Sequence, residues 1–131
     1  MSESVVILFS FVLVSLGAIL GSVLRWTIIK NSESIFKENF FGILTVNNIS
    51  IFFLGILLGL FNRYQFNFYS HPFFLFTGIG FLGSLSTFST FIIELLEFII
   101  DRKWKKFFLV TLLSISSGIF IAFLGYELTN G

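Results

Sequence analysis

Residues 78–91 read GIGFLGSLSTFSTF, and they lie inside an uncharged run that extends from residue 64 to residue 93. Glycine and hydroxyl residues crowd this stretch, although leucine and isoleucine are the residues that lipid favours at mid-bilayer depth. Non-helical backbone persists at that depth only where protein buries it or where it lines a cavity. Interrupted helices of this kind present free amides and carbonyls that can bind ions. The stretch therefore predicts a membrane helix over about 72–100 that is broken near residues 83–87.

Three further runs contain no Asp, Glu, Lys or Arg, at residues 4–24, 39–62 and 107–126. A bilayer core requires about 20 apolar residues in a helix, and backbone groups in lipid must be hydrogen-bonded within their own segment. We therefore expect an all-α integral membrane protein that forms a single membrane domain over residues 1–131. Its four transmembrane helices are predicted at about 4–26, 39–61, 72–100 and 106–127.

The composition excludes most other classes. Of 131 residues, 56% are hydrophobic and 11% are charged, whereas a soluble domain carries roughly 25% charged residues. The absence of cysteine and the single histidine exclude disulfide frameworks and Cys/His zinc sites. Without a nucleophile–base pair we expect no enzyme, and a net charge of +1 offers nothing to nucleic acid. The first run has no preceding positive charge and no small-residue cleavage site after it, so we expect it to be retained rather than cleaved as a signal peptide.

Small residues recur at the spacing that lets two membrane helices approach closely. Gly17-x-x-x-Gly21 and Gly55-x-x-x-Gly59 predict helix packing. The same explanation competes for the glycines of the third run, but hydroxyl groups there favour a binding site. The hydroxyl residues of that run are Ser84, Ser86, Thr87, Ser89 and Thr90.

Two amides fall near the centre of the second run, at Asn47 and Asn48. A buried amide without partners costs a few kcal/mol. At least one of them should therefore face another helix or a wet pathway. An interhelical hydrogen bond is the alternative explanation for either residue alone.

Polar and aromatic side chains also share helix faces. Thr111, Ser114 and Ser117 recur every three residues and so lie along one face of the fourth helix, where a track of hydroxyls can replace part of an anion's hydration shell. Phe88 and Phe91 project from one side of the third helix, and the edge of an aromatic ring carries partial positive charge. In a chain with 21 phenylalanines, packing is the ordinary explanation for such a pair.

Charged residues stand near the predicted membrane interfaces. Arg25 is placed to attract anions into a vestibule, and Glu94 follows Thr90 by one helical turn, where it could line the same passage. Snorkelling to the interface is the competing explanation for such residues. His71 precedes Pro72 and is expected to start the third helix.

Taken together, these segments resemble the CrcB/Fluc family of fluoride channels. Residues 80–91, GFLGSLSTFSTF, are similar to that family's GFCGGxTTFSTF signature, and residues 42–55 are similar to its GTLxVNxxGxFxxG pattern. Gly17-Ala18 with Arg25 resembles an element of the family's first helix. The motifs occur in the family's order, and the four-helix layout covers essentially the whole chain.

The resemblance implies a passive channel that exports cytoplasmic fluoride and so reduces its toxicity. It further implies an antiparallel dimer with two fluoride pathways and a structural, non-transported Na⁺ at the dimer interface. By position, the backbone carbonyls of Gly83 and Ser86 would hold that ion. The resemblance and the polar pattern together nominate the residues of the fluoride pathway: Asn47, Phe88, Phe91, Thr87, Ser114, Arg25 and Glu94.

Several positions depart from the family pattern. Leu82 stands where the third-helix signature has cysteine, which nothing in the mechanism requires. Ser84 replaces the second glycine of the third-helix signature, and Ser86 replaces its first threonine. A carbonyl ligand tolerates the second change, because any residue supplies a carbonyl. Ser50 replaces the glycine of the second-helix pattern, which could alter packing at that crossing.

Basic residues are distributed unevenly between the two sides of the predicted membrane domain. Only Arg63 belongs to the side that holds both termini. The other side holds Arg25, Lys30, Lys37, Arg102, Lys103, Lys105 and Lys106. The positive-inside rule then predicts a cell-membrane protein with both termini outside. A fixed orientation favours pairing with an oppositely inserted paralogue, and a homodimer is the alternative.

Two other functions compete with the channel. A small four-helix proton-coupled multidrug exporter has a similar architecture, but it needs an ionisable carboxylate in its first helix, and the run 4–24 has none. A subunit that only organises lipid or other proteins has little reason to keep Asn47 and the hydroxyl residues of 84–90.

Overall fold

The computed structural model describes residues 2–32, 39–67 and 71–130. Four long apolar segments in this part of the chain are long enough to cross a membrane, which confirms the all-helical prediction. Three are continuous: α1 (Glu3–Ser32), α2 (Asn39–Tyr64) and α6 (Trp104–Asn130). The third is divided into α3 (Pro72–Phe74), the π-helix η1 (Leu75–Leu82), α4 (Gly83–Leu85) and α5 (Ser89–Ile100).

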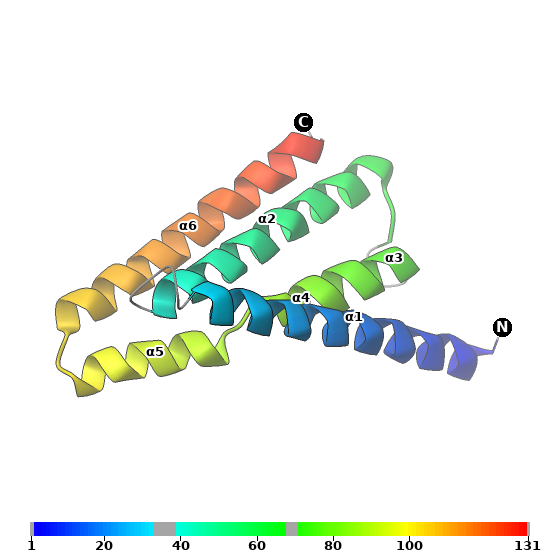
Figure 1. Ribbon diagram of the computed structural model, residues 1–131. Helices are drawn as coiled ribbons and strands as arrows, with labels where there is room; N and C mark the ends of the chain where they lie inside the picture. Colours follow the sequence, from blue (N-terminus) through cyan, green and yellow to red (C-terminus); the bar gives the residue numbers. More distant parts are fainter. Residues whose placement is uncertain (1, 33–38, 68–70, 131) are drawn as a thin grey trace.

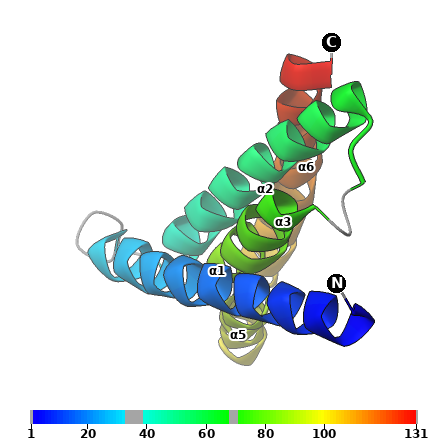
Figure 2. The same ribbon diagram turned by 90° about the vertical axis from the view of Figure 1, so that its right-hand side faces the viewer.

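The helices α2 and α6 lie side by side and run in the same direction (Figures 1 and 2). Glycines make this approach possible. A Cβ atom added at Gly55 would lie 2.6 Å from the carbonyl oxygen of Ala122, and one at Gly125 would overlap the carbonyl oxygen of Phe52. The packing interpretation of Gly55-x-x-x-Gly59 is confirmed, since only small residues let the two backbones meet.

A second close crossing joins α1 to the first half of the third segment. Figure 2 shows α1 lying across the front of the bundle, where it contacts η1 and α4. A Cβ atom at Gly80 would lie 2.6 Å from the carbonyl oxygen of Val14, and one at Gly17 would overlap that of Phe76. Gly17 and Gly21 therefore also serve packing, as their spacing predicted.

The third segment changes its helical geometry before it breaks. In η1 the hydrogen bonds span five residues, and the N–H of Gly83 still donates to the carbonyl of Gly78. The short helix α4 ends at Leu85, and Ser86 is extended, with φ −73° and ψ 152°. The bend predicted at 83–87 is present, but the non-helical residues are 86–88, because Gly83 to Leu85 remain helical. The π-helix was not anticipated from the sequence.

The start of the third segment has a conventional cap. His71 is extended, and its Nδ1 atom accepts a hydrogen bond of 3.3 Å from the N–H of Phe73. Pro72 occupies the first helical position, where the missing N–H costs nothing. The helix-entry role predicted for His71 is confirmed.

Beyond the break, α5 diverges from η1 and packs against the start of α6 (Figure 1). Leu95 and Phe98 of α5 form a buried cluster with Val110 of α6. The turn between these helices uses Arg102 at φ 56°. It lies on the side of the molecule opposite the start of α1 and the end of α6 (Figure 1).

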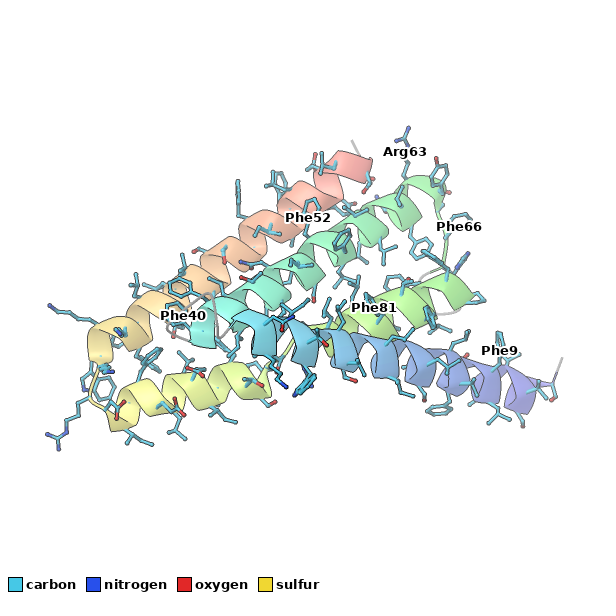
Figure 3. All side chains as sticks on the ribbon, viewed as in Figure 1. Phe9, Phe40, Phe52, Arg63, Phe66 and Phe81 are labelled. Atoms are coloured by element: carbon cyan, nitrogen blue, oxygen red, sulfur yellow. The ribbon has the colours of Figure 1, made fainter. Side chains whose placement is uncertain are left out.

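The outer helix faces are apolar and exposed. Large hydrophobic side chains such as Leu8 and Leu112, each 65% exposed, cover α1 and α6. Figure 3 shows side chains projecting outward along all the helices. Such surfaces are stable only in lipid or against another protein surface, because water would solvate them poorly. The chain is a multi-pass membrane protein.

Candidate functional site

The break in the third segment opens onto a groove of about 240 Å³ between α2, α5 and α6. Five of the residues nominated for the fluoride pathway line it, together with Ser86 and three further residues of α2. The complete lining consists of Leu44, Asn47, Asn48, Ile51, Ser86, Thr87, Phe88, Phe91 and Ser114. Because these residues are far apart in sequence, only the packing of α2 and α6 around the break brings them together.

Asn47 binds the backbone of the break through both ends of its side-chain amide. Its Oδ1 atom accepts from the N–H of Thr87 at 2.7 Å, and its Nδ2 atom donates to the carbonyl of Thr87 at 3.1 Å. An asparagine side chain offers one acceptor and two N–H donors. Asn47 can therefore hold Thr87 and still present one N–H to the groove.

The hydroxyl of Thr87 stabilises the restart of the helix. Thr87 is buried, and its Oγ1 atom accepts from the N–H of Thr90 at 3.4 Å and donates to the Thr90 hydroxyl at 3.1 Å. Hydroxyl residues commonly satisfy the first free N–H groups of a helix in this manner. Two of the hydroxyls that crowd the sequence thus have a structural role at the break.

The two nominated phenylalanines have different surroundings. Phe88, in the break, is 76% exposed. Phe91, in the first turn of α5, packs against the cluster of Leu95, Phe98 and Val110. Both rings line the groove, but only Phe91 is held by the interior of the fold.

On α6, the three hydroxyls that were predicted to share one helix face have different partners. Ser114 lines the groove. Ser117 and Asn48 exchange hydrogen bonds of 3.4 Å between α6 and α2. The hydroxyl of Thr111 donates to the carbonyl of Phe107 in its own helix at 2.7 Å.

Asn48 lines the groove, but the sequence did not assign it a role in the fluoride pathway. Asn47 matched a family motif, whereas Asn48 was noticed only as an amide at mid-membrane depth. Its partner could not be identified from the sequence because the register of α2 against α6 depends on tertiary packing.

The two charged residues nominated for the pathway are not part of the groove lining. Arg25 lies one turn after Gly21, on the helix that crosses η1 and α4. Glu94 is half-buried on α5, one turn after Thr90. The groove itself is lined by hydroxyls, amides, rings and aliphatic side chains, and none of these carries a formal charge.

Two of the family-pattern departures are accommodated locally. Ser50 is buried, and its hydroxyl donates to the carbonyl of Val46 at 2.8 Å. The hydroxyl of Ser84 donates to the carbonyl of Phe81 at 3.1 Å, close to Gly21 of α1. Each hydroxyl is satisfied within its own membrane segment, so neither replacement leaves a buried polar atom without a partner.

The two carbonyls nominated as cation ligands lie at the two ends of a short helix. Small hard cations prefer oxygen ligands, and α4 begins at Gly83 and is followed by Ser86. The Gly83 carbonyl accepts from the Ser86 hydroxyl at 3.4 Å. Gly83 is exposed, and a Cβ atom there would meet nothing nearer than the Gly78 carbonyl oxygen at 3.7 Å. Across residues 2–32, 39–67 and 71–130, no group of three His, Cys, Asp or Glu side chains could hold a metal ion. Two carbonyls complete a coordination shell only if another copy or another chain contributes its own.

Comparison with known proteins finds relatives that match most of the chain. The model of the family described as CrcB-like protein, Camphor Resistance (CrcB), matches residues 12–126. The fluoride-specific ion channel FluC 2 of Prochlorococcus marinus is 39% identical over 123 residues, which cover 92% of each chain. FluC 1 from another strain of that species is 34% identical over 119 residues, or 91% of each chain. FluC of Haemophilus influenzae is 39% identical over 112 residues, or 86% of each chain.

These relatives are named as ion channels and not as enzymes, in agreement with the expectation from the sequence. The matched residues include α2, the break and most of α6, so the groove lies within the region of similarity. Because the family model covers most of the chain and each of the three relatives shares about a third or more of the aligned residues, this protein belongs to the CrcB/FluC family of fluoride-specific ion channels.

Proposed function

We propose that this chain conducts fluoride passively through the groove beside the break. The observation that carries the proposal is the lining itself, which combines neutral hydrogen-bond donors with two aromatic rings. Fluoride is small and strongly hydrated, so a selective pathway must replace its water with donors. A fixed positive charge in the lining would bind the ion too tightly for it to leave, whereas neutral donors allow release.

Each nominated residue has a part in this mechanism. The free N–H of Asn47 and the hydroxyl of Ser114 would donate to the ion from α2 and α6. The ring edges of Phe88 and Phe91 would face it with their partial positive charge. Thr87 shapes the wall that these groups form, and Arg25 and Glu94 would act at the ends of the passage, outside the groove.

We further propose that a structural Na⁺ lies where two breaks meet. The carbonyls of Gly83 and Ser86, with those of an antiparallel partner, would form its oxygen shell. When bound, the ion supplies positive charge that holds the two breaks together, and it is not transported. The inside-negative membrane potential would drive fluoride out at about 2.3 kcal/mol per charge per 100 mV.

The charge distribution favours a paralogue as the antiparallel partner. The seven-to-one bias in Lys and Arg favours one orientation, with both termini outside. A chain inserted in one orientation needs an oppositely inserted paralogue to form an antiparallel pair. A homodimer requires this chain to insert both ways despite its charges.

The decisive experiment is voltage-driven fluoride efflux from liposomes that contain the purified chain alone, with Na⁺ present. A fluoride electrode records the release, and a chloride electrode provides the selectivity control. We expect rapid efflux of fluoride and not of chloride if the homodimer forms. If the folded chain is silent, the paralogue is added, and continued silence would refute the proposed function.

A further inference from the structure

The hydrogen bonds at the break have a consequence for the two carbonyls nominated as cation ligands. We propose that Asn47 is a positioning residue: by binding the backbone of Thr87, it keeps the third helix open and removes the helical N–H donor of the Gly83 carbonyl. That carbonyl accepts from the Ser86 hydroxyl at 3.4 Å and keeps a second lone pair for a cation. The proposal rests on the proposed function for the identity of the cation. The positioning itself is a property of this chain.

The first step concerns the N–H of Thr87. In a continuous α-helix this N–H would donate to the carbonyl four residues earlier, which is that of Gly83. Here it donates to Oδ1 of Asn47 at 2.7 Å instead. The side chain of α2 thus takes the donor that the Gly83 carbonyl would otherwise receive.

The second step concerns the N–H of Thr90. In a continuous helix it would donate to the carbonyl of Ser86, but it donates to the hydroxyl of Thr87 at 3.4 Å. Both nominated carbonyls therefore lose their helical donors, and both donors are taken by side chains at the break. The Nδ2 bond from Asn47 to the Thr87 carbonyl, at 3.1 Å, fixes Thr87 from its other side.

The third step distinguishes Asn47 from its neighbour. Asn48 also lines the groove, but its amide bonds to the side chain of Ser117 on α6 and not to the backbone of the break. If Asn47 served only as a groove donor or as a helix-packing amide, the two residues would have equivalent effects on the break. If Asn47 positions the break, only its replacement will alter Thr87 and the cation site.

The experiment compares Asn47→Ala, Asn47→Asp and the matched control Asn48→Ala in the full-length chain. The chain is purified alone or, if the wild type alone shows no Na⁺-dependent rise in melting temperature, together with its paralogue. The first measurement is hydrogen exchange at the Thr87 amide, followed by NMR in detergent. Since the lost hydrogen bond to a buried amide is worth about 1 kcal/mol or more, we expect exchange in Asn47→Ala to be about tenfold faster. Asn47→Asp keeps the Oδ acceptor and should stay near wild type at Thr87. Asn48→Ala should also leave this amide protected.

The second measurement is the Na⁺ concentration at which half of the maximal rise in melting temperature is reached. We expect Asn47→Ala to raise this midpoint about tenfold, because the two bonds that shape the carbonyl site are lost. Asn48→Ala should leave the midpoint unchanged.

Each outcome decides the proposal. Wild-type rates of exchange at Thr87 in folded Asn47→Ala, or equal midpoint shifts in the Ala variants of Asn47 and Asn48, would overturn it. If Asn47→Ala does not fold, the comparison rests on Asn47→Ser, whose shorter, uncharged side chain cannot make both bonds to the backbone of Thr87. Its Na⁺ midpoint must then exceed that of Asn48→Ala. Absence of fluoride efflux from the wild-type chain and its paralogue would refute the channel, but would leave the exchange result standing.

Discussion

Ser114 and Ser116 carry the same side chain two positions apart on α6, and they meet different surroundings. Ser114 lines the groove, whereas Ser116 is exposed and donates to the carbonyl of Leu112 in its own helix at 2.7 Å. We expect Ser114→Ala to lower fluoride efflux about tenfold, the cost of one lost hydrogen bond to an anion. Ser116→Ala should not change efflux from liposomes. Equal losses in the two variants would show that the groove is not the pathway.

Substitutions at Phe88 and Phe91 should have different effects on stability but similar effects on conduction. Phe91 packs against the α5–α6 cluster and Phe88 is 76% exposed. We expect Phe91→Ala to lower the free energy of unfolding by about 2 kcal/mol, roughly half the cost of truncating a fully buried phenylalanine. Phe88→Ala should change it by less than about 0.5 kcal/mol, as for other exposed positions. Both should reduce fluoride efflux.

For the Phe88 and Phe91 variants, denaturant titration in detergent measures the free energy of unfolding. Fluoride efflux from liposomes measures conduction. A Phe88→Ala variant as unstable as Phe91→Ala would contradict the exposed position of that ring. Efflux that survives both substitutions would remove the rings from the mechanism.

At the scale of elements, helix packing depends on particular glycines. On α6, a Cβ atom at Gly125 would overlap the Phe52 carbonyl oxygen, whereas one at Gly118 would meet only the flexible end of Ile51 at 3.4 Å. We expect Gly125→Ala to lower the free energy of unfolding by about 1–3 kcal/mol, the usual cost of overpacking. Gly118→Ala is the matched control and should be close to neutral. Denaturant titration of both variants checks the register of α2 against α6.

The start of the third segment depends on the cap at His71. Its Nδ1 atom accepts from the N–H of Phe73 at 3.3 Å. We expect His71→Ala to destabilise the protein by about 1 kcal/mol, because an N–H at the helix start loses its partner. His71→Asn supplies another acceptor and should recover most of the loss. If His71→Ala and His71→Asn have the same melting temperature, the cap contributes nothing to stability.

The third segment shows which features of an element can be predicted. Its small and hydroxyl residues indicated a break, and the break is there. Its position shifted to residues 86–88 because α2 supplies the acceptor for the N–H of Thr87. The π-helix over Leu75–Leu82 was missed, because its apolar residues would suit an α-helix equally well. Within it, Gly80 lies against the backbone of α1.

At the scale of the whole molecule, basic residues divide between its two sides. Arg63 lies at the end of α2, beside the end of α6, and the basic turn between α5 and α6 lies on the opposite side (Figures 1 and 3). We expect a reporter fused to the C-terminus to be found on the outside only, because seven basic residues retain the other side in the cytoplasm. Accessibility labelling in intact cells measures this. Comparable populations on both sides would support a homodimer instead.

The sequence by itself determined the class of the protein and the segments that cross the membrane. Long uncharged runs can be stable only as helices in lipid, so composition and length were sufficient. The motifs also indicated the family and most of the residues around the groove. Those inferences need only the local order of residues.

The tertiary structure decided which of these residues meet. The groove exists because glycine contacts set the register of α2 against α6. No local pattern fixes such a register, because the residues that meet, such as Asn48 and Ser117, are 60 or more positions apart in the sequence. The pairing of Asn47 with Thr87 also depends on the register between helices. Asn47 was assigned to the pore from the sequence, and the structure shows that its amide also binds the backbone of the break. The tertiary structure also leaves Arg25 and Glu94 outside the groove lining. Helix crossing angles, and not sequence spacing, determine which helix faces converge.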